Sequence, residues 1–258
     1  MKKILLLLFL LQVLFPFAQT TDANGKKQGY WKKKDETGNH LLYEGEFKDN
    51  KPVGRFKYYY PNDSVRAIMN FKQEGKVAYA KLFHSTGKRM GEGKYIQEIK
   101  DSVWTYYDES GTLLSRDEYT MGKKNGVSYV YLRDGKLAEE RNYKMDLQHG
   151  PFKQYLDGKK LRGQGNYVNG QLDGKATYYY PNGVEVASGY YKNGQKTGPW
   201  IYKEENGKIK EKEWYVNGQL ASPKETEAFF AKSKNPEKTA VNTPTTGLYN
   251  LQKEKKGK

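Results

Sequence analysis

The sequence predicts an all-β fold: an elongated, single-layer antiparallel β-sheet of about eight stacked β-hairpins of 24 residues each. Two columns of residues that recur every 24 positions carry this prediction, because a fixed period of this length is typical of repeat architectures. The aromatic column is Phe47, Phe71, Tyr95, Tyr119, Tyr143, Tyr167, Tyr191 and Tyr215. The turn column is Gly54, Ala78, Ser102, Gly126, Gly150, Gly174 and Gly198. With 23 Tyr, 27 Gly and a mean hydropathy of −0.98, the composition suits a thin sheet packed through rings.

The N-terminal residues 1–18 read as a signal peptide. Lys2 and Lys3 precede the apolar run Ile4–Phe15, and Ala18 is the expected cleavage position. An uncleaved anchor helix is the alternative, but the run is shorter than the roughly 20 residues that a membrane span needs. We therefore expect an exported protein that is periplasmic, outer-membrane-associated or secreted.

A short leader, residues 19–25, precedes the repeat array, residues 26–221. In the seventh repeat the expected order is a strand at 175–180, a turn at Pro181–Gly183 and a second strand at 184–191. Asn-Gly and Asp-Gly pairs at such turns predict hairpins, because these residues tolerate positive φ.

Alternation along the strands separates two faces of the sheet. One inner column is Phe56, Ala80, Trp104, Ser128, Phe152, Ala176 and Trp200, and two positions further on the same face come Tyr58, Leu82, Tyr106, Val130, Gln154, Tyr178 and Tyr202. Large and small residues alternate in the inner column, so each ring can lean over a small neighbour. The residues expected to define the repeat are Gly54, Gly126, Gly150, Gly174, Gly198, Trp104 and Trp200. The third repeat departs most from the pattern, with Ala78 and Ala80 where a glycine and a ring are usual, and we expect it to pack less well.

The opposite face carries the candidate binding surface, an outer row of rings. Its members are Tyr59, Phe83, Tyr107, Tyr131, Tyr155 and Tyr179. Tyrosine is favoured at interfaces because it combines apolar area with a hydroxyl group. The alternative is that these rings are simply strand residues that pack well.

The C-terminal part changes character after the repeats. Residues 222–232 are expected to form a short helix whose Phe229 and Phe230 cap the last hairpin. Residues 233–258 read as a disordered basic tail, with a basic arm that contacts an anionic surface as the alternative.

No catalytic, cofactor-binding or metal-binding residues are predicted. His40, His84 and His149 fall in different columns, and no nucleophile, metalloprotease or phosphate-loop motif occurs. The strand carboxylates are expected to pair with Lys and Arg across the sheet; they are Glu44, Glu46, Asp117, Glu118, Glu139 and Glu140. The net charge of +15 favours anionic partners, namely an acidic protein, phospholipid or an acidic glycan, and export argues against nucleic acid.

One repeat unit can be read from Gly198–Tyr202, Tyr178–Gly183 and Tyr191–Gly194. On these residues the unit resembles the MORN repeat, and more closely the bacterial MORN variant of proteins labelled YwqK-family antitoxins. The resemblance implies an antiparallel hairpin sheet, and a role in scaffolding, in membrane association or in binding a partner protein. We expect an exported, non-enzymatic scaffold for protein–protein interaction in the cell envelope, with toxin neutralisation as one form of it. Binding to phospholipid or anionic glycan is the alternative, and a hydrolase acting on envelope polymers is a third hypothesis.

Overall fold

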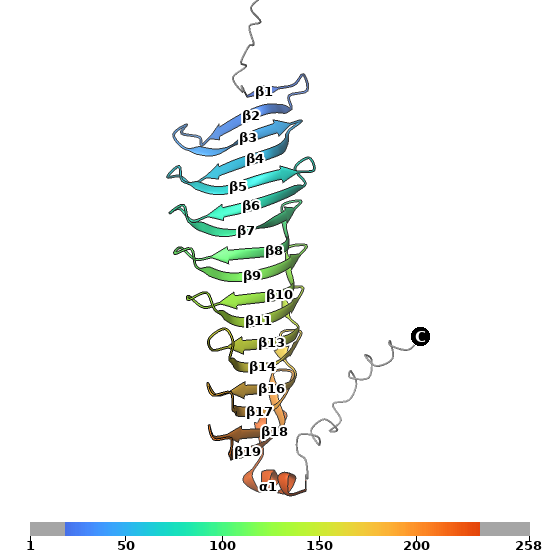
Figure 1. Ribbon diagram of the computed structural model, residues 1–258. Coiled ribbons are helices and arrows are strands. Elements are labelled where there is room, and N and C mark those ends of the chain that lie inside the picture. The colour runs from blue at the N-terminus through green and yellow to red at the C-terminus, as the bar shows by residue number, and fades with distance from the viewer. Residues whose placement is uncertain (1–18, 233–258) are drawn as a thin grey trace, which may run out of the picture. The chain divides into compact units, whose positions relative to one another are not determined.

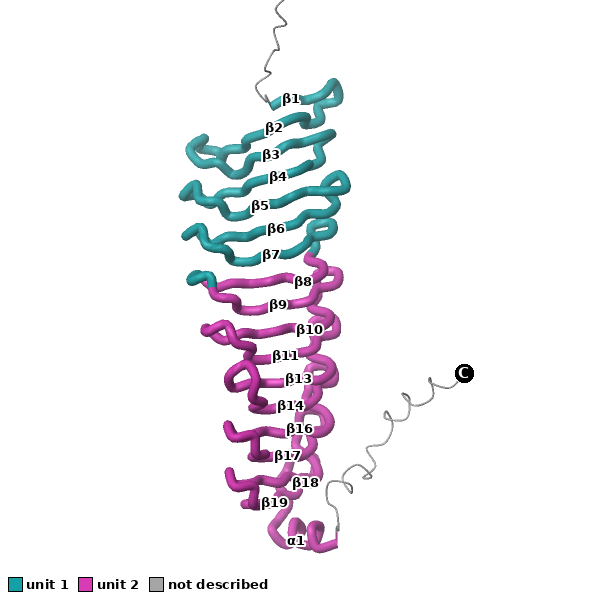
Figure 2. Tube along the Cα trace, in the orientation of Figure 1, with its two compact units in different colours: residues 1–99, 109–111 teal, residues 100–108, 112–258 magenta. Residues whose placement is uncertain are grey.

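The computed structural model describes residues 19–232. The signal peptide and basic tail expected from the sequence lie outside the described residues. Two compact units divide the chain: unit 1 comprises residues 1–99 and 109–111, and unit 2 comprises residues 100–108 and 112–258 (Figure 2). Both units consist of antiparallel strands, and unit 2 adds one helix.

Unit 1 is a run of antiparallel strands in which each strand pairs with the next along the chain (Figure 1). The strands are β1 (Thr20–Thr21), β2 (Lys27–Lys34), β3 (Leu41–Lys48), β4 (Lys51–Tyr59), β5 (Val65–Lys72), β6 (Val77–Phe83) and β7 (Arg89–Ile96).

Unit 2 continues the same pattern and ends in a helix. Its strands are β8 (Ile99–Tyr107), β9 (Leu113–Thr120), β10 (Lys123–Tyr131), β11 (Leu137–Lys144), β12 (Leu147–Gln148), β13 (Gly150–Tyr155), β14 (Leu161–Val168), β15 (Gln171–Leu172), β16 (Gly174–Tyr179), β17 (Glu185–Lys192), β18 (Gln195–Lys203), β19 (Ile209–Val216) and β20 (Gln219–Leu220). The helix α1 spans Pro223–Lys232. The prediction of an all-β fold built from antiparallel hairpins is therefore confirmed.

Two kinds of turn alternate along the chain. The loop between β16 and β17 places only Gly183 in the left-handed region (φ 87°), and its N–H donates to the Tyr180 carbonyl at 2.9 Å. The link between β14 and β15 instead places both Asn169 (φ 50°) and Gly170 (φ 85°) there. Two adjacent residues of positive φ are typical of a two-residue type I′ hairpin, whose twist matches that of the flanking strands. The Asn-Gly pairs therefore serve two different turns.

The turn column also bends the strands. Gly54, Gly126, Gly150, Gly174 and Gly198 all have positive φ, from 65° to 120°. Close to three of these glycines the strand register is interrupted, in the pairs β3–β4, β10–β9 and β17–β18, as a β-bulge requires. Ala78 is outside the left-handed region, and β5 pairs with β6 in unbroken register. The third repeat thus lacks a bulge that other repeats contain.

In each unit the core is a row of side chains on one face of the strands. All seven residues of the inner column are buried, with exposed fractions between 0% for Trp104 and 7% for Phe152. The large rings lie over glycines of the neighbouring strand: a Cβ on Gly45 would lie 2.4 Å from Phe56, and one on Gly189 would lie 2.2 Å from Trp200. The rings thus pack against bare backbone as well as against small side chains.

Candidate functional site

The face that carries the buried inner column is called the ring face from here on. On it, lysine ammonium groups lie over the rings of the strands. The Lys196 Nζ is 4.4 Å from the Trp200 ring centroid and 4.9 Å from that of Tyr215. It also donates to the Tyr202 hydroxyl at 2.7 Å. A cation held over ring faces in this way gains from their quadrupoles.

Two more repeats contain the same arrangement. Lys27 lies 4.9 Å from the Trp31 centroid, and Lys100 lies 4.8 Å from that of Trp104. In all three repeats the lysine stands four residues before the tryptophan. Burial lowers the pKa of Lys100, and the nearby Asp117 carboxylate counteracts part of this shift. These three cages are filled by the chain's own lysines.

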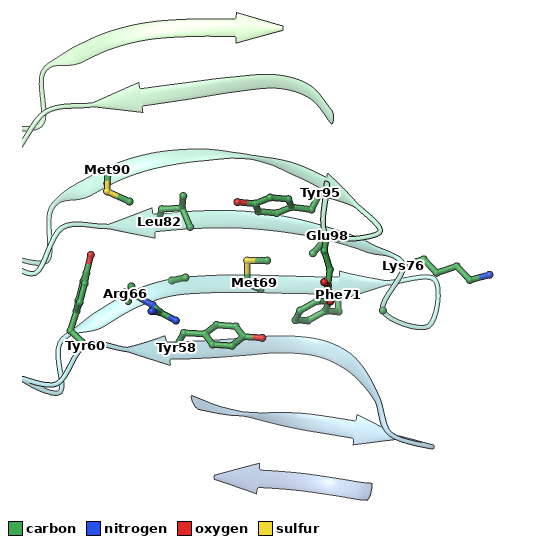
Figure 3. A pocket seen from close by; sticks show the side chains of 13 residues that line it. Tyr58, Tyr60, Arg66, Met69, Phe71, Lys76, Leu82, Met90, Tyr95 and Glu98 are labelled. Atoms are coloured by element: carbon green, nitrogen blue, oxygen red, sulfur yellow. The ribbon is translucent and has the colours of Figure 1, made fainter. Parts of the chain in front are cut away.

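Unit 1 also contains an open apolar cavity of about 470 Å³ on its ring face (Figure 3). Its floor includes Ala67 and Ala78, which are buried with exposed fractions of 8% and 4%. The complete lining is Tyr58, Tyr60, Arg66, Ala67, Met69, Phe71, Gly75, Lys76, Ala78, Leu82, Met90, Tyr95 and Glu98. Polarisable Met side chains and rings of this kind favour adaptable contacts with apolar ligands or partner side chains.

The walls of the cavity follow from the strand register. Tyr58 and Leu82 are the cross-strand partners of Ala67. Phe71 and Tyr95 are the partners of Ala78, on β5 and β7. Ala67 and Ala78 thus each lie between two larger side chains on the neighbouring strands. The small volume of the two alanines leaves the cavity open. Burial raises the pKa of Tyr58 and of Tyr95 above the ordinary value for tyrosine.

Three charged residues line the cavity beside these apolar groups. The side chains of Arg66, Lys76 and Glu98 make no ion pair or hydrogen bond with any residue that the structure describes. In Figure 3 the Lys76 side chain points away from the cavity. The lining therefore carries two cations and one carboxylate that are available to a partner.

The structure places the predicted outer row on the opposite face. All six members, Tyr59, Phe83, Tyr107, Tyr131, Tyr155 and Tyr179, are half-buried. Three of their hydroxyl groups bond to a side chain 15 residues earlier. Tyr59 donates to Glu44 at 2.6 Å, Tyr155 donates to Glu140 at 2.9 Å, and Gln164 donates to the Tyr179 hydroxyl at 2.7 Å. These three hydroxyl groups therefore already form hydrogen bonds within the sheet. The role of the outer row in binding stays a prediction.

Glu44 is the most heavily bonded carboxylate on this opposite face. Lys57 donates to it at 3.2 Å, and the Lys32 ammonium lies at 3.4 Å. Burial raises the pKa of Glu44, but the hydrogen bonds from Tyr59, Lys57 and its other partners outweigh burial and hold the pKa at about 2. Burial and the hydrogen bond to Glu44 raise the pKa of Tyr59. The cluster is a structural network between β2, β3 and β4.

Two observations on the described residues bear on catalysis. Within residues 19–232 no three His, Asp or Glu side chains cluster to hold a metal ion. The buried Asp117 accepts from Ser128 and, at 3.0 Å, from the Lys124 ammonium. Ser128 is only 3% exposed, so its hydroxyl group is not accessible to a substrate.

The cavity was not predicted from the sequence. Its signal was present, since the third repeat has Ala78, Ala80 and Leu82 where the last full repeat has Gly198, Trp200 and Tyr202. What the sequence does not show is whether Met69 fills the missing volume.

No helix within the described residues has the length and apolar character needed to cross a bilayer.

Family comparisons agree with the hairpin repeats. The MORN repeat matches residues 43–65 and 164–185, and the MORN repeat variant matches residues 124–145 and 148–169. No curated protein matches the chain. One similar solved structure, titled "Crystal Structure of TcdB2-TccC3-TEV", shares 13% sequence identity at a TM-score of 0.22. This match covers 79% of this chain and 14% of that chain, and at this TM-score it supports no inference about function.

Proposed function

We propose that this chain, which carries MORN and MORN-variant repeats, is an exported, non-catalytic scaffold that binds a partner protein in the cell envelope. The observation that carries the proposal is the apolar cavity of unit 1, whose lining is mostly rings, Met and Ala. Protein interfaces use such residues in the buried centre and charged residues at the rim. Toxin neutralisation is one form that this binding could take.

Binding to phospholipid or anionic glycan is the second candidate. The net charge of +15 favours it, because exposed lysines attract anionic surfaces. Salt separates the two functions. Attraction between exposed charges is screened over roughly 10 Å at 0.1 M salt and over about 3 Å at 1 M salt, whereas contacts with an apolar cavity persist.

Affinity capture tests the proposal. The immobilised chain is incubated with envelope extract at 0.1 M and at 1 M salt, and bound material is identified by mass spectrometry. The proposal expects one protein, retained at both salt concentrations. Capture of lipid or glycan alone, and only at low salt, would instead assign the chain to surface binding. Export is tested separately by fractionating cells and determining the N-terminal residue of the protein, which is expected to be Gln19.

A further inference from the structure

The repeat that follows the cavity by 120 residues provides an internal reference for it. Ala67 of the cavity corresponds to Ala187, and both alanines are 8% exposed. Ala67 lies between Tyr58 and Leu82 on the adjacent strands, whereas Ala187 lies between Tyr178 and Tyr202. The two alanines therefore have equivalent cross-strand partners. The strands beside them differ, because the register of β17–β18 is interrupted next to Ala187 whereas that of β5–β6 is unbroken, and the neighbouring side chains differ as well.

In the reference repeat the space is filled by an indole ring. Trp200 lies over Gly189, and its ring is only 1% exposed. The corresponding residues at the cavity are Ala80 for Trp200 and Met69 for Gly189. Leu82 further replaces the phenol ring of Tyr202. One Met side chain thus stands where the reference repeat has an indole, and about 470 Å³ remains open.

The rest of the lysine cage is still present at the cavity. Lys76 corresponds to Lys196, and Tyr95 corresponds to Tyr215. Lys196 lies over the Trp200 and Tyr215 rings, whereas Lys76 contacts no ring of the part of the chain that the structure describes and points away from the cavity (Figure 3). The cavity therefore has the cation and one ring wall of a cage whose central ring is absent.

We propose that this cavity binds an aromatic side chain, preferentially an indole, that an acidic segment of a partner protein inserts over Ala67 and Ala78. The inserted ring would take the place that Trp200 occupies in the reference repeat, and Lys76 would turn over its face. This inference rests on the proposed protein-binding function and names the chemistry of the partner. Tryptophan and tyrosine are the residues that most often anchor protein interfaces in this way.

Charge complementarity indicates that the segment around the ring is acidic. Residues 19–99 contain sixteen Lys and Arg against ten Asp and Glu. At the cavity itself Arg66 and Lys76 form no ion pair with a carboxylate of residues 19–232, and Glu98 is the single acid in the lining. Carboxylates beside the inserted ring would pair with these two cations, which a basic segment would not do.

A defined peptide tests the proposal directly. The probe is a fluorescently labelled peptide, Gly-Asp-Glu-Trp-Glu-Asp-Gly, titrated with the purified full chain and followed by fluorescence anisotropy. Two comparison peptides replace Trp by Leu, or all acids by Lys. The Trp peptide is expected to bind saturably and at least about tenfold more tightly than either comparison peptide, since burying an anchor ring dominates such contacts.

Variants locate the binding. Ala67→Leu fills the floor of the cavity, and Leu82→Tyr restores the residue that the reference repeat carries, so at least the second variant suits the fold. Both are expected to weaken binding of the Trp peptide by about tenfold or more. Ala187→Leu is the matched control, because it adds the same volume at the equivalent position of the reference repeat and should leave peptide binding unchanged.

The outcomes separate this inference from the proposed function. Equal binding of the Trp and Leu peptides, or unchanged binding by Leu82→Tyr, overturns the inference. If envelope capture retains one protein at high salt, and Leu82→Tyr retains it equally well, the scaffold function stands and the indole site is wrong. If no protein is captured but the Trp peptide binds with the expected variant pattern, the site stands and the envelope partner is wrong.

Discussion

The Lys196 ammonium lies 4.4 Å from the centroid of the Trp200 ring, and both residues belong to strand β18. Because strand side chains alternate between faces, residues four apart point to the same face and can meet there. The same spacing joins Lys27 to Trp31 and Lys100 to Trp104. Where the inner column has Phe56 or Phe152 instead, the position four residues earlier is Pro52 or Gln148. Each inner-column tryptophan is thus preceded by this lysine, and its ring binds cations best. Lys76 and Lys124 have the same spacing to the small residues Ala80 and Ser128.

Replacing Lys196 by Met should destabilise the end of unit 2. The substitution keeps an unbranched stem but removes the ammonium from the Trp200 and Tyr215 rings and from the Tyr202 hydroxyl. The expected loss is about 1–2 kcal/mol in the free energy of unfolding, measured by amide hydrogen exchange of β17 and β18. Lys208→Met, at an exposed position without ring contact, is the control and should change stability by less than about 0.5 kcal/mol. Equal effects of the two variants would show that the ring contact is not stabilising.

Replacing Gly189 by Ala should have a larger effect. A Cβ at this position would lie 2.2 Å from the Trp200 ring, so the ring would have to leave its place. Overpacking of this severity is expected to cost about 3 kcal/mol, seen as a lower midpoint in urea unfolding followed by fluorescence.

The double variant with Trp200→Ala checks the cause of that loss. If the clash with the ring is responsible, Gly189→Ala costs little once the ring is gone, and the two changes are not additive. Additive losses would mean that backbone conformation at Gly189, rather than the ring, sets the cost.

The fold could be predicted because its determinants repeat. Phe47 and its equivalents place the strands, and Gly183 with its equivalents places the loops, so an error at one repeat is corrected by the others. The alternation of Trp104, Ser128 and Phe152 in the inner column likewise identified the face that is buried.

The remaining features depend on contacts that the period does not encode. Gly189, which packs under the Trp200 ring, belongs to a 24-residue column that is not uniformly glycine. Met69, Asp117 and Arg141 stand at the equivalent positions, so the sequence pattern does not predict this contact. The cavity exists because Met69 fills only part of a missing ring, which is a matter of side-chain volume and not of polarity. The outer row lies within strands, but the bond from Tyr59 on β4 to Glu44 on β3 is a side-chain contact that the period does not encode.

Acid should weaken unit 1 through Glu44. Its pKa is about 2 in the folded chain against an ordinary value of 4.5, so the carboxylate contributes stability above pH 4.5 and loses it as the pH falls through the range from 4.5 to 2. The contribution is up to about 3 kcal/mol at neutral pH. Hydrogen exchange of β3 and β4 should therefore accelerate over this range.

Glu44→Gln should remove most of that acid dependence and lower the stability at pH 7. Glu46→Gln is the matched control, because Glu46 is on the same strand and is exposed. It should leave the pH profile of β3 and β4 unchanged. An acid transition that persists in Glu44→Gln would assign the effect to another carboxylate.

The helix α1 should protect the last full hairpin of unit 2. The Phe229 ring stacks on Trp214 of β19, with 3.7 Å between centroids and an interplanar angle of 23°. The helix begins with reciprocal bonds between Ser222 and Glu225, which fix its first turn. Phe229→Ala removes the ring contact and should cost about 1 kcal/mol, with faster amide exchange in β19 and little change in β16. Glu227→Ala, an exposed change in the same helix, should leave β19 unaffected. If the amides of β19 exchange at the same rate in the unsubstituted protein and in the Phe229→Ala variant, the stacking contact does not stabilise this strand.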